Sequence, residues 1–174
     1  MRKQLKKFEG PRHPWKADRI LDENKLISEY GLVNKREIYK AQSKLRNWRE
    51  QAKQIVGLMG DKKEIAEKIL LEKLQRLGLL AEGSTVDDIL SLNVRNVLEK
   101  RLQTIIYKKG LAITAKQARQ FIVHRKVLVN SEKMDSPSYF VRPADEIAFV
   151  PGFNPKIMAE QAKAEQKAVE AQKK

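Results

Sequence analysis

The sequence contains no cysteine, and this absence removes several kinds of chemistry at once. Disulfide bonds, thiolate nucleophiles, and zinc or iron–sulfur sites with cysteine ligands are all excluded. The two histidines, His13 and His124, lie far apart in the sequence and do not form a usual metal site by themselves. The sequence therefore predicts a protein that binds neither a metal ion nor another cofactor.

Long apolar runs and catalytic signatures are also missing. No run approaches the roughly 18 apolar residues of a membrane-spanning helix, and the basic start lacks the apolar segment of a secretory signal. Neither spelling of a glycine-rich phosphate loop occurs, and no local signature indicates a Ser/His/Asp set or a convergent pair of acids. We therefore expect a cytoplasmic protein that is not an enzyme and has no membrane or small-molecule partner.

Positive charge, in contrast, is in excess. Lysine and arginine number 36 against 22 acidic residues, which gives a formal net charge of +14. Residues 1–53 carry 15 basic and 7 acidic residues, residues 54–94 carry 5 and 7, and residues 95–150 carry 11 and 5. Such an excess indicates a polyanionic partner, for which nucleic acid fits better than a membrane. We expect two basic contact regions with a packing element between them.

The clearest helix of the first half is predicted over residues 35–56, after an Asn34 cap with Glu37 three residues later. Apolar residues recur at spacings of three and four, and they predict the inner face: Ile38, Ala41, Leu45, Trp48, Ala52 and Ile55. The remaining surface is basic, with Lys35, Arg36, Lys40, Lys44, Arg46, Arg49 and Lys53. Because so few acids alternate with these cations, we interpret this face as a nucleic-acid contact, with an ordinary solvated face as the alternative.

The fold class is predicted as α+β. A helical N-terminal domain is expected over residues 1–94, with helices at 17–30, 35–56 and 61–77 and a short capped turn at 85–92. A second domain is expected over 95–152, with helices at 94–109 and 114–126 packed on a small antiparallel sheet of strands at 127–130, 139–142 and 146–150. The tail 153–174 is basic and helix-prone, and we expect it to order only against a partner.

The short helix that begins at Thr114 has two different faces. Its inner side is predicted to hold Ala115, Ala118, Phe121 and Ile122. Its outer side holds Lys116, Gln117, Arg119, Gln120 and His124, and Arg125 and Lys126 follow at the C-terminal end, where cations suit the helix dipole. Such groups suit phosphates and ribose hydroxyls. Taken alone, the helix fits an ordinary solvated basic face equally well.

The run RLQTIIYKKGLAITAKQARQFIVHRKVLVN at 101–130, continued by SPSYFV at 136–141 and DEI at 145–147, resembles the S-four RNA-binding domain. The segments PRHPW at 11–15, YGLVNKREIYKA at 30–41 and DILSL at 88–92 resemble the archaeal form of the ribosomal S-four family. This resemblance implies a structural protein of the small ribosomal subunit that binds small-subunit rRNA early in assembly. It also implies neighbouring small-subunit proteins as partners and a place near the side where mRNA enters.

The family pattern also implies RNA-contacting residues, which are Arg101, Thr114, Lys116, Gln117, Arg119, Gln120, His124, Arg125, Lys126, Ser136 and Tyr139. The sequence departs from the family at Ser131 and Ala144, where many members have glycine, and it lacks the N-terminal cysteines that bind a metal or cluster in many bacterial members. Two alternatives remain at this point. One is a non-ribosomal factor that binds structured RNA during processing or as a chaperone, and the other is a fragment of an RNA-modifying enzyme.

Overall fold

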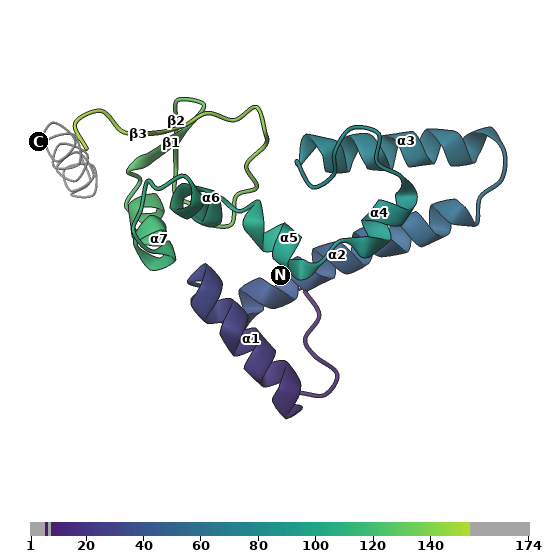
Figure 1. Cartoon of the computed structure of the whole chain (residues 1–174), viewed down its shortest axis with the longest axis horizontal. Helices are drawn as coiled ribbons and strands as arrows, with labels where there is room; N and C mark the ends of the chain where they lie inside the picture. Colours follow the sequence, from purple (N-terminus) through teal and green to yellow (C-terminus); the bar gives the residue numbers. More distant parts are fainter. Residues whose placement is uncertain (1–5, 7, 154–174) are drawn as a thin grey trace, which may run out of the picture. The chain divides into compact units, whose positions relative to one another are not determined.

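The computed structural model describes residue 6 and residues 8–153 (Figure 1). The chain divides into two compact units, one formed by Met1–Arg101 with Phe140–Pro143 and the other by Leu102–Tyr139 with the chain from Ala144 onward. Helices dominate, and one small sheet completes the structure, so the predicted α+β class is confirmed. None of the described helices has the length and apolar character needed to span a bilayer. The expected tail 153–174 lies outside the described residues except for Phe153.

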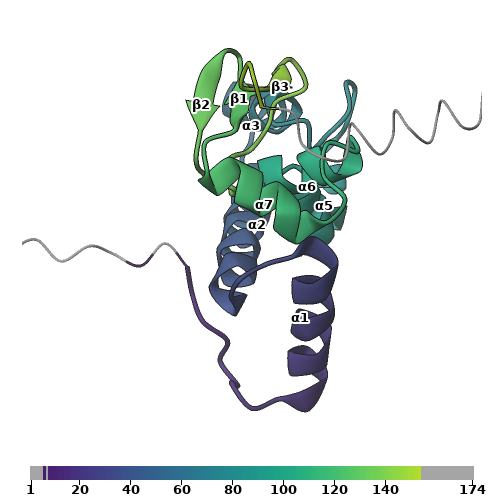
Figure 2. The ribbon, with the colours of Figure 1, turned by 90° about the vertical axis from the view of Figure 1, so that its left-hand side faces the viewer.

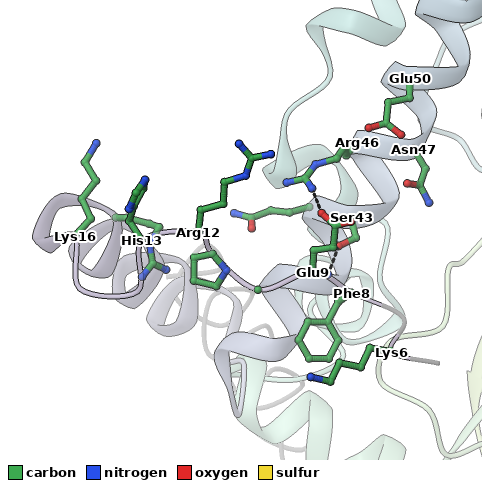
Figure 3. A pocket seen from close by; sticks show the side chains of 14 residues that line it. Lys6, Phe8, Glu9, Arg12, His13, Lys16, Ser43, Arg46, Asn47 and Glu50 are labelled. Carbon is green, nitrogen blue, oxygen red and sulfur yellow. Dashed lines mark hydrogen bonds and ion pairs between the residues drawn. The ribbon is translucent and has the colours of Figure 1, made fainter. Parts of the chain in front are cut away.

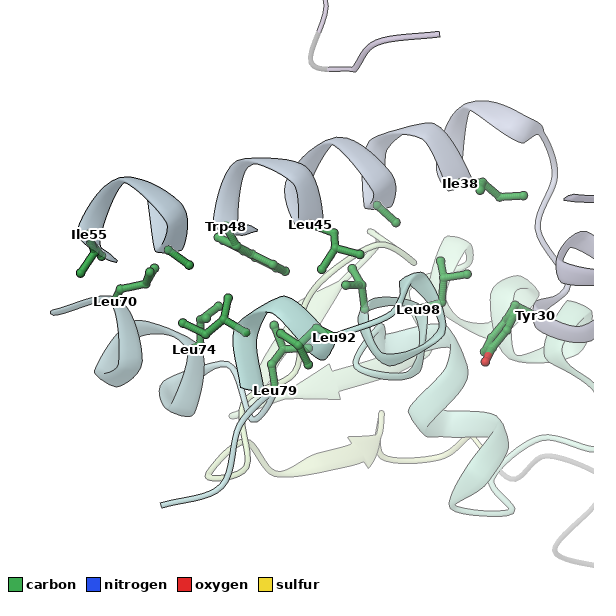
Figure 4. Close-up of a cluster of buried hydrophobic side chains, with 14 of the residues drawn as sticks. Tyr30, Ile38, Leu45, Trp48, Ile55, Leu70, Leu74, Leu79, Leu92 and Leu98 are labelled. Atoms are coloured by element: carbon green, nitrogen blue, oxygen red, sulfur yellow. The ribbon is translucent and has the colours of Figure 1, made fainter. Parts of the chain in front are cut away.

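The first unit is built around one long helix. It contains α1 (Ala17–Tyr30), α2 (Lys35–Val56), α3 (Asp61–Arg76), α4 (Val86–Ser91) and α5 (Val94–Glu99), and α2 contacts each of the other four. The six apolar residues predicted to face inward from α2 are all buried, and they meet leucines of the neighbouring helices (Figure 4). The spacing of three and four residues therefore identified the inner face of α2 correctly.

Two helix ends of the first unit follow local sequence signals, and the start of α2 follows its signal only in part. Gly31 ends α1 with a left-handed backbone (φ 58°), which glycine adopts without a steric penalty. Asp88 accepts a hydrogen bond from the backbone N–H of Thr85 at 2.8 Å, as expected for the capped start of α4. Asn34 precedes α2, but its side chain makes no capping hydrogen bond. Instead the Glu37 carboxylate accepts from the backbone N–H of Val33 at 3.3 Å, so Asn34 holds the predicted cap position but its side chain does not make the predicted capping hydrogen bond.

The helix predicted over 94–109 is interrupted at Lys100 and Arg101. Arg101 forms an antiparallel β-bridge with Phe140, and the N–H of Val141 donates to the carbonyl of Lys100 at 3.1 Å. These hydrogen bonds end α5, and they explain why 140–143 belongs to the first unit. The predicted strand at 139–142 is wrong, because only this bridge forms there. The expected domain boundary between residues 94 and 95 falls inside α5.

The second unit packs two helices with a small sheet (Figure 2). The helices are α6 (Leu102–Lys108) and α7 (Ala115–Val123), and the strands are β1 (Val127–Val129), β2 (Glu132–Met134) and β3 (Ile147–Phe149). The sheet is antiparallel with the order β2-β1-β3. Buried side chains from both helices and β1 form its core: Leu102, Ile106, Ala118, Ile122, Val127 and Val129. The prediction of two helices packed on a small antiparallel sheet is confirmed.

A two-residue turn joins β1 to β2. Val129 pairs with Glu132, which leaves Asn130 and Ser131 as the turn, and both have positive φ values of 50° and 70°. This combination matches the primed turns that suit the twist of a hairpin. The Asn130 amide donates to Asp145 at 2.8 Å and accepts from the N–H of Glu146 at 3.0 Å. Asn130 therefore ties the turn to the chain that leads into β3.

Candidate nucleic-acid interface

Three cations follow one another at four-residue spacing on α2, and we call Arg36, Lys40 and Lys44 the α2 ridge. This spacing places them in one row along the helix, and the row borders the buried apolar stripe at Lys44, since the buried Trp48 follows four residues later. All three residues are exposed, and none forms an ion pair with another described residue. The Arg36 guanidinium lies 5.8 Å from the centre of the Phe8 ring. The α2 ridge is therefore available to an anionic partner.

Lys44 has the most unusual environment on this ridge. Its ammonium lies 4.1 Å from the centre of the Phe140 ring, a favourable cation–π arrangement. Partial burial lowers the pKa of Lys44 below its ordinary value, and the positive charges of Arg101 and Lys40 lower it further. A phosphate near the α2 ridge would offset this repulsion.

The other predicted cations of α2 have partners within the first unit or lie elsewhere on the helix. Lys35 forms an ion pair of 3.2 Å with Glu23. Arg46 pairs with Glu9 of the N-terminal arm, and both side chains are exposed. Arg49 is half-buried and donates to the carbonyl of Leu92. Lys53 is exposed and has no ion pair within the described part of the chain.

Arg101 belongs to the first unit, where it is buried. It is not part of the exposed surface of the Thr114 helix. It forms an ion pair with Glu37, and the two side chains are only 6% and 15% exposed. Glu37 also accepts from the N–H of Val33, so the pair connects the start of α2 to the end of α5. This buried ion pair gives Arg101 a structural role in the fold. Its contact with RNA stays a prediction.

Thr114 and Gln117 fix the start of α7. The Thr114 hydroxyl accepts from the backbone N–H of Gln117 at 3.2 Å, so the predicted N-cap is confirmed. The Gln117 side chain in turn accepts from the N–H of Ile113 at 3.0 Å. Both side chains therefore satisfy backbone groups that would otherwise be unpaired at the helix end.

The outer side of α7 carries a second row of polar side chains at four-residue spacing. We call Lys116, Gln120 and His124 the α7 ridge. All three are exposed, and their side chains form no hydrogen bond or ion pair with other described residues. Arg119 lies beside them but is half-buried, and it donates to the buried Gln103 at 3.3 Å. Gln103 donates to the carbonyl of Ala115 at 2.9 Å, which holds this arginine in a defined position. The α7 ridge thus offers a cation, an amide and an imidazole for contacts with phosphates and sugars.

The end of α7 is also basic. Arg125 has a positive φ of 55° and forms an exposed ion pair of 3.1 Å with Asp135. The Lys126 ammonium lies 5.6 Å from the centre of the Phe153 ring. Phe153 packs edge-to-face with Phe121 and Phe149, so the ring next to Lys126 belongs to a small aromatic cluster. Exposed ion pairs are weak in water, so a phosphate can replace Asp135 at Arg125.

The two residues predicted in the later loop lie at different depths. The Ser136 hydroxyl is exposed and lies 3.3 Å from the hydroxyl of Ser138. Tyr139 is half-buried, and its hydroxyl donates to Asp145 at 3.4 Å. The backbone carbonyl of Tyr139 accepts from the N–H of Leu102 at 2.8 Å. Ser136 is therefore the more accessible of the two to a partner, whereas Tyr139 helps to hold the loop.

Comparison with known proteins places this geometry in a family. The S4 domain family matches residues 100–147, which cover α6, α7, β1, β2 and the first residue of β3. The chain is 47% identical over 159 residues to the small ribosomal subunit protein uS4 of Nanoarchaeum equitans, covering 89% of this chain and 88% of that protein. It is 40% identical over 175 residues to uS4 of Methanosphaera stadtmanae, covering 99% and 96%, and 49% identical over 146 residues to uS4 of Saccharolobus islandicus, covering 83% and 81%.

These similarities extend over both units and confirm the resemblance to the archaeal ribosomal form. The family is structural, so the prediction that the chain is not an enzyme is confirmed as well. The chain belongs to the uS4 family of small ribosomal subunit proteins, in its archaeal form, and contains an S4 domain.

Proposed function

We propose that the chain binds small-subunit rRNA directly through two basic surfaces and helps to nucleate assembly of the subunit. One surface is α2 with the N-terminal arm, where the α2 ridge lies. The other is the Thr114 helix, where the α7 ridge lies. The observation that carries the proposal is the α7 ridge, because its three exposed side chains serve no partner within the described residues and suit RNA phosphates and riboses.

The remaining partners follow from the family resemblance. Neighbouring small-subunit proteins and mRNA on the side where it enters are proposed as contacts, within ribosomes of the cytoplasm. The expected absence of metal ions, other cofactors and small-molecule substrates stays part of this proposal. Crosslinking the full chain to small-subunit rRNA and identifying both sides of each crosslink would test which residues meet RNA.

Salt dependence of binding tests the mechanism. If phosphate contacts dominate, affinity falls by about 0.7–0.9 log units per log unit of salt for each phosphate neutralised. Lys116→Ala should weaken binding by about 1–3 kcal/mol without loss of folding, as for other charged contacts. Lys68→Ala is the matched control, since Lys68 is an exposed lysine on α3, a helix that carries neither ridge. Equal affinity of the wild-type chain and the Lys116 variant would show that the α7 ridge is the wrong face.

Co-sedimentation separates the ribosomal role from a role in a non-ribosomal RNA factor. The proposal expects the chain in washed small subunits at one copy per subunit. Recovery only in post-ribosomal fractions would contradict it.

A further inference from the structure

The N-terminal arm and α2 form the walls of a groove of about 930 Å³ (Figure 3). Arm residues 8–13 line one wall, and the exposed side of α2 from Gln42 to Glu50 lines the other. Lys16 and Arg19 contribute from the beginning of α1. The whole groove lies within the first unit. Its volume falls in the range of sites that bind small organic molecules, and it is far larger than a single ion requires.

Contacts at both ends hold the arm in place. The Phe8 ring stacks on Tyr39 with 6.3 Å between ring centres and an angle of 28°. The N–H of Glu9 donates to the Ser43 hydroxyl at 3.1 Å. At the other end, Arg19 donates to the carbonyl of Pro14 at 2.6 Å. The intervening residues 10–13 therefore span the groove between two attachment points, and the groove exists before a ligand arrives.

The lining of the groove is predominantly basic. It contains five cations (Lys6, Arg12, Lys16, Arg19 and Arg46) and two acids (Glu9 and Glu50). Arg19 pairs with Glu23 and Arg46 pairs with Glu9, so these two cations are already engaged. Lys6, Arg12 and Lys16 are exposed and form no ion pair within the described part of the chain. Free cations in a concave site select an anionic ligand.

An exposed tryptophan that adjoins the groove in the sequence narrows the choice of anion. Trp15 does not itself line the groove, but it directly precedes the lining residue Lys16 in the chain, and it is 90% exposed. A tryptophan with so little packing has a free ring face on which a base can stack. The amides of Gln42 and Asn47, which also line the groove, can donate to and accept from base edges. Bases inside an RNA duplex are already stacked, so this combination favours an unpaired nucleotide.

We infer that this groove binds an unpaired nucleotide of RNA, with its phosphates at Arg12 and Lys16 and its base stacked on Trp15. The inference rests on the proposed function and makes it more specific. The α2 and α7 ridges contact the RNA backbone without regard to pairing, whereas the groove requires a looped-out or single-stranded nucleotide.

Fluorescence of the full chain provides the test, because the sequence contains only two tryptophans. Trp48 is buried, so quenching by an added oligouridylate of about eight nucleotides would report on Trp15. Binding of a labelled oligouridylate should weaken between about 5- and 150-fold in Trp15→Ala, the range for one stacked base. Trp15→Phe should keep most of the affinity because it keeps a ring, but should lose the quenching signal.

Substitution of the cations gives an independent measurement. The double variant Arg12→Ala/Lys16→Ala should bind the oligouridylate more weakly, and its log-affinity against log-salt slope should fall by about 1.4, equivalent to two single-strand phosphates. Lys68→Ala, with an exposed lysine on α3, should match the wild-type chain. An RNA duplex of equal length and a polyglutamate peptide serve as comparison ligands, since they offer negative charge without unpaired bases.

The possible results separate the groove from the proposed function. If folded small-subunit rRNA binds but the oligouridylate neither quenches Trp15 nor responds to the substitutions, the groove inference is overturned while the proposed function stands. If the duplex or polyglutamate binds as tightly and depends equally on Arg12 and Lys16, the groove takes another polyanion and the inference is also overturned. If neither rRNA nor oligouridylate binds, both proposals fail.

Discussion

Replacing Arg101 by alanine separates two roles that family resemblance and geometry assign to this residue. The resemblance makes Arg101 an RNA contact, whereas in the structure its side chain is 6% exposed and paired with Glu37. If the ion pair is its role, Arg101→Ala lowers the free energy of unfolding and leaves the RNA affinity of the folded protein unchanged. If RNA contact is its role, the affinity falls and the stability does not.

The size of the stability loss can be worked from the contacts. Removing one partner of a buried ion pair costs about 3–5 kcal/mol, because the remaining charge is left without compensation. In the variant, Glu37 keeps the hydrogen bond from the N–H of Val33 at 3.3 Å, and its side chain is 15% exposed. Loss of Arg101 also removes one positive charge that lowers the pKa of Lys44. These effects favour the lower end, about 3 kcal/mol.

Urea unfolding followed by Trp48 fluorescence measures this loss, because Trp48 is buried in the first unit. With an m-value of about 2 kcal/mol per molar urea, the midpoint should fall by about 1.5 M. Lys40→Ala, an exposed change on α2, should stay within about 0.5 kcal/mol of wild type. The double change Arg101→Met/Glu37→Leu should recover most of the stability, since no charge remains buried alone. An unchanged midpoint with a tenfold loss of RNA affinity would refute the reasoning.

Three further predictions concern separate parts of the chain. Thr114→Ala should reduce protection of the α7 amides from hydrogen exchange by about 1 kcal/mol, whereas Thr114→Ser should preserve it, because only the hydroxyl accepts from the N–H of Gln117. The lowered pKa of Lys44 penalises folding below that pKa, and the penalty disappears as the pH rises toward the ordinary value of 10.5. Urea unfolding at about pH 8 and about pH 10 should therefore show a smaller gain or a larger loss of stability with pH in Lys44→Met than in wild type. Ser131→Gly should raise the thermal stability by about 0.5–1 kcal/mol, since glycine adopts the observed φ of 70° without strain; no gain in a melting experiment would contradict this.

The sequence predicted best those features that depend on neighbours within one helix. The inner stripe of α2 was identified because apolar residues from Ile38 to Ile55 recur at spacings of three and four, and the six residues of that stripe are all buried. The Thr114 cap was identified because its hydrogen bond reaches only three residues ahead. The four residues from Asn130 to Lys133 also indicate a turn from local sequence, and the structure limits this turn to Asn130 and Ser131, because Glu132 and Lys133 belong to β2.

Features set by distant parts of the chain could not be predicted in the same way. Leu98 and Leu102 are both fully buried and lie four residues apart, so the apolar pattern continues through the break between α5 and α6. The break depends on Phe140, which pairs with Arg101 from far along the sequence. The same limit applies to the ion pair of Arg101 with Glu37, which are 64 residues apart.

Two of the α2 cations have acidic partners outside α2, and these pairs weaken the inference of RNA binding from charge alone. On α2 alone, so many cations with so few acids repel one another unless a polyanion such as RNA faces them. In the structure, acids from other segments relieve part of that repulsion, since Glu23 pairs with Lys35 and Glu9 with Arg46. The Arg46 pair is exposed on both sides and contributes about 0–1 kcal/mol, so a phosphate can replace Glu9 at little cost.

Of the seven predicted cations, Arg36, Lys40, Lys44 and Lys53 have no ion pair within the described residues, and the first three of these form the α2 ridge. Arg36, Lys40 and Lys44 rise about 6 Å from one to the next, as positions four residues apart on a helix must. Lys116, Gln120 and His124 repeat this spacing on α7. Each unit therefore presents a row of three polar side chains that form no ion pair with other described residues. If RNA follows these ridges, substitutions along them should weaken binding by similar amounts, whereas substitution of the half-buried Arg49 should act through the stability of the fold.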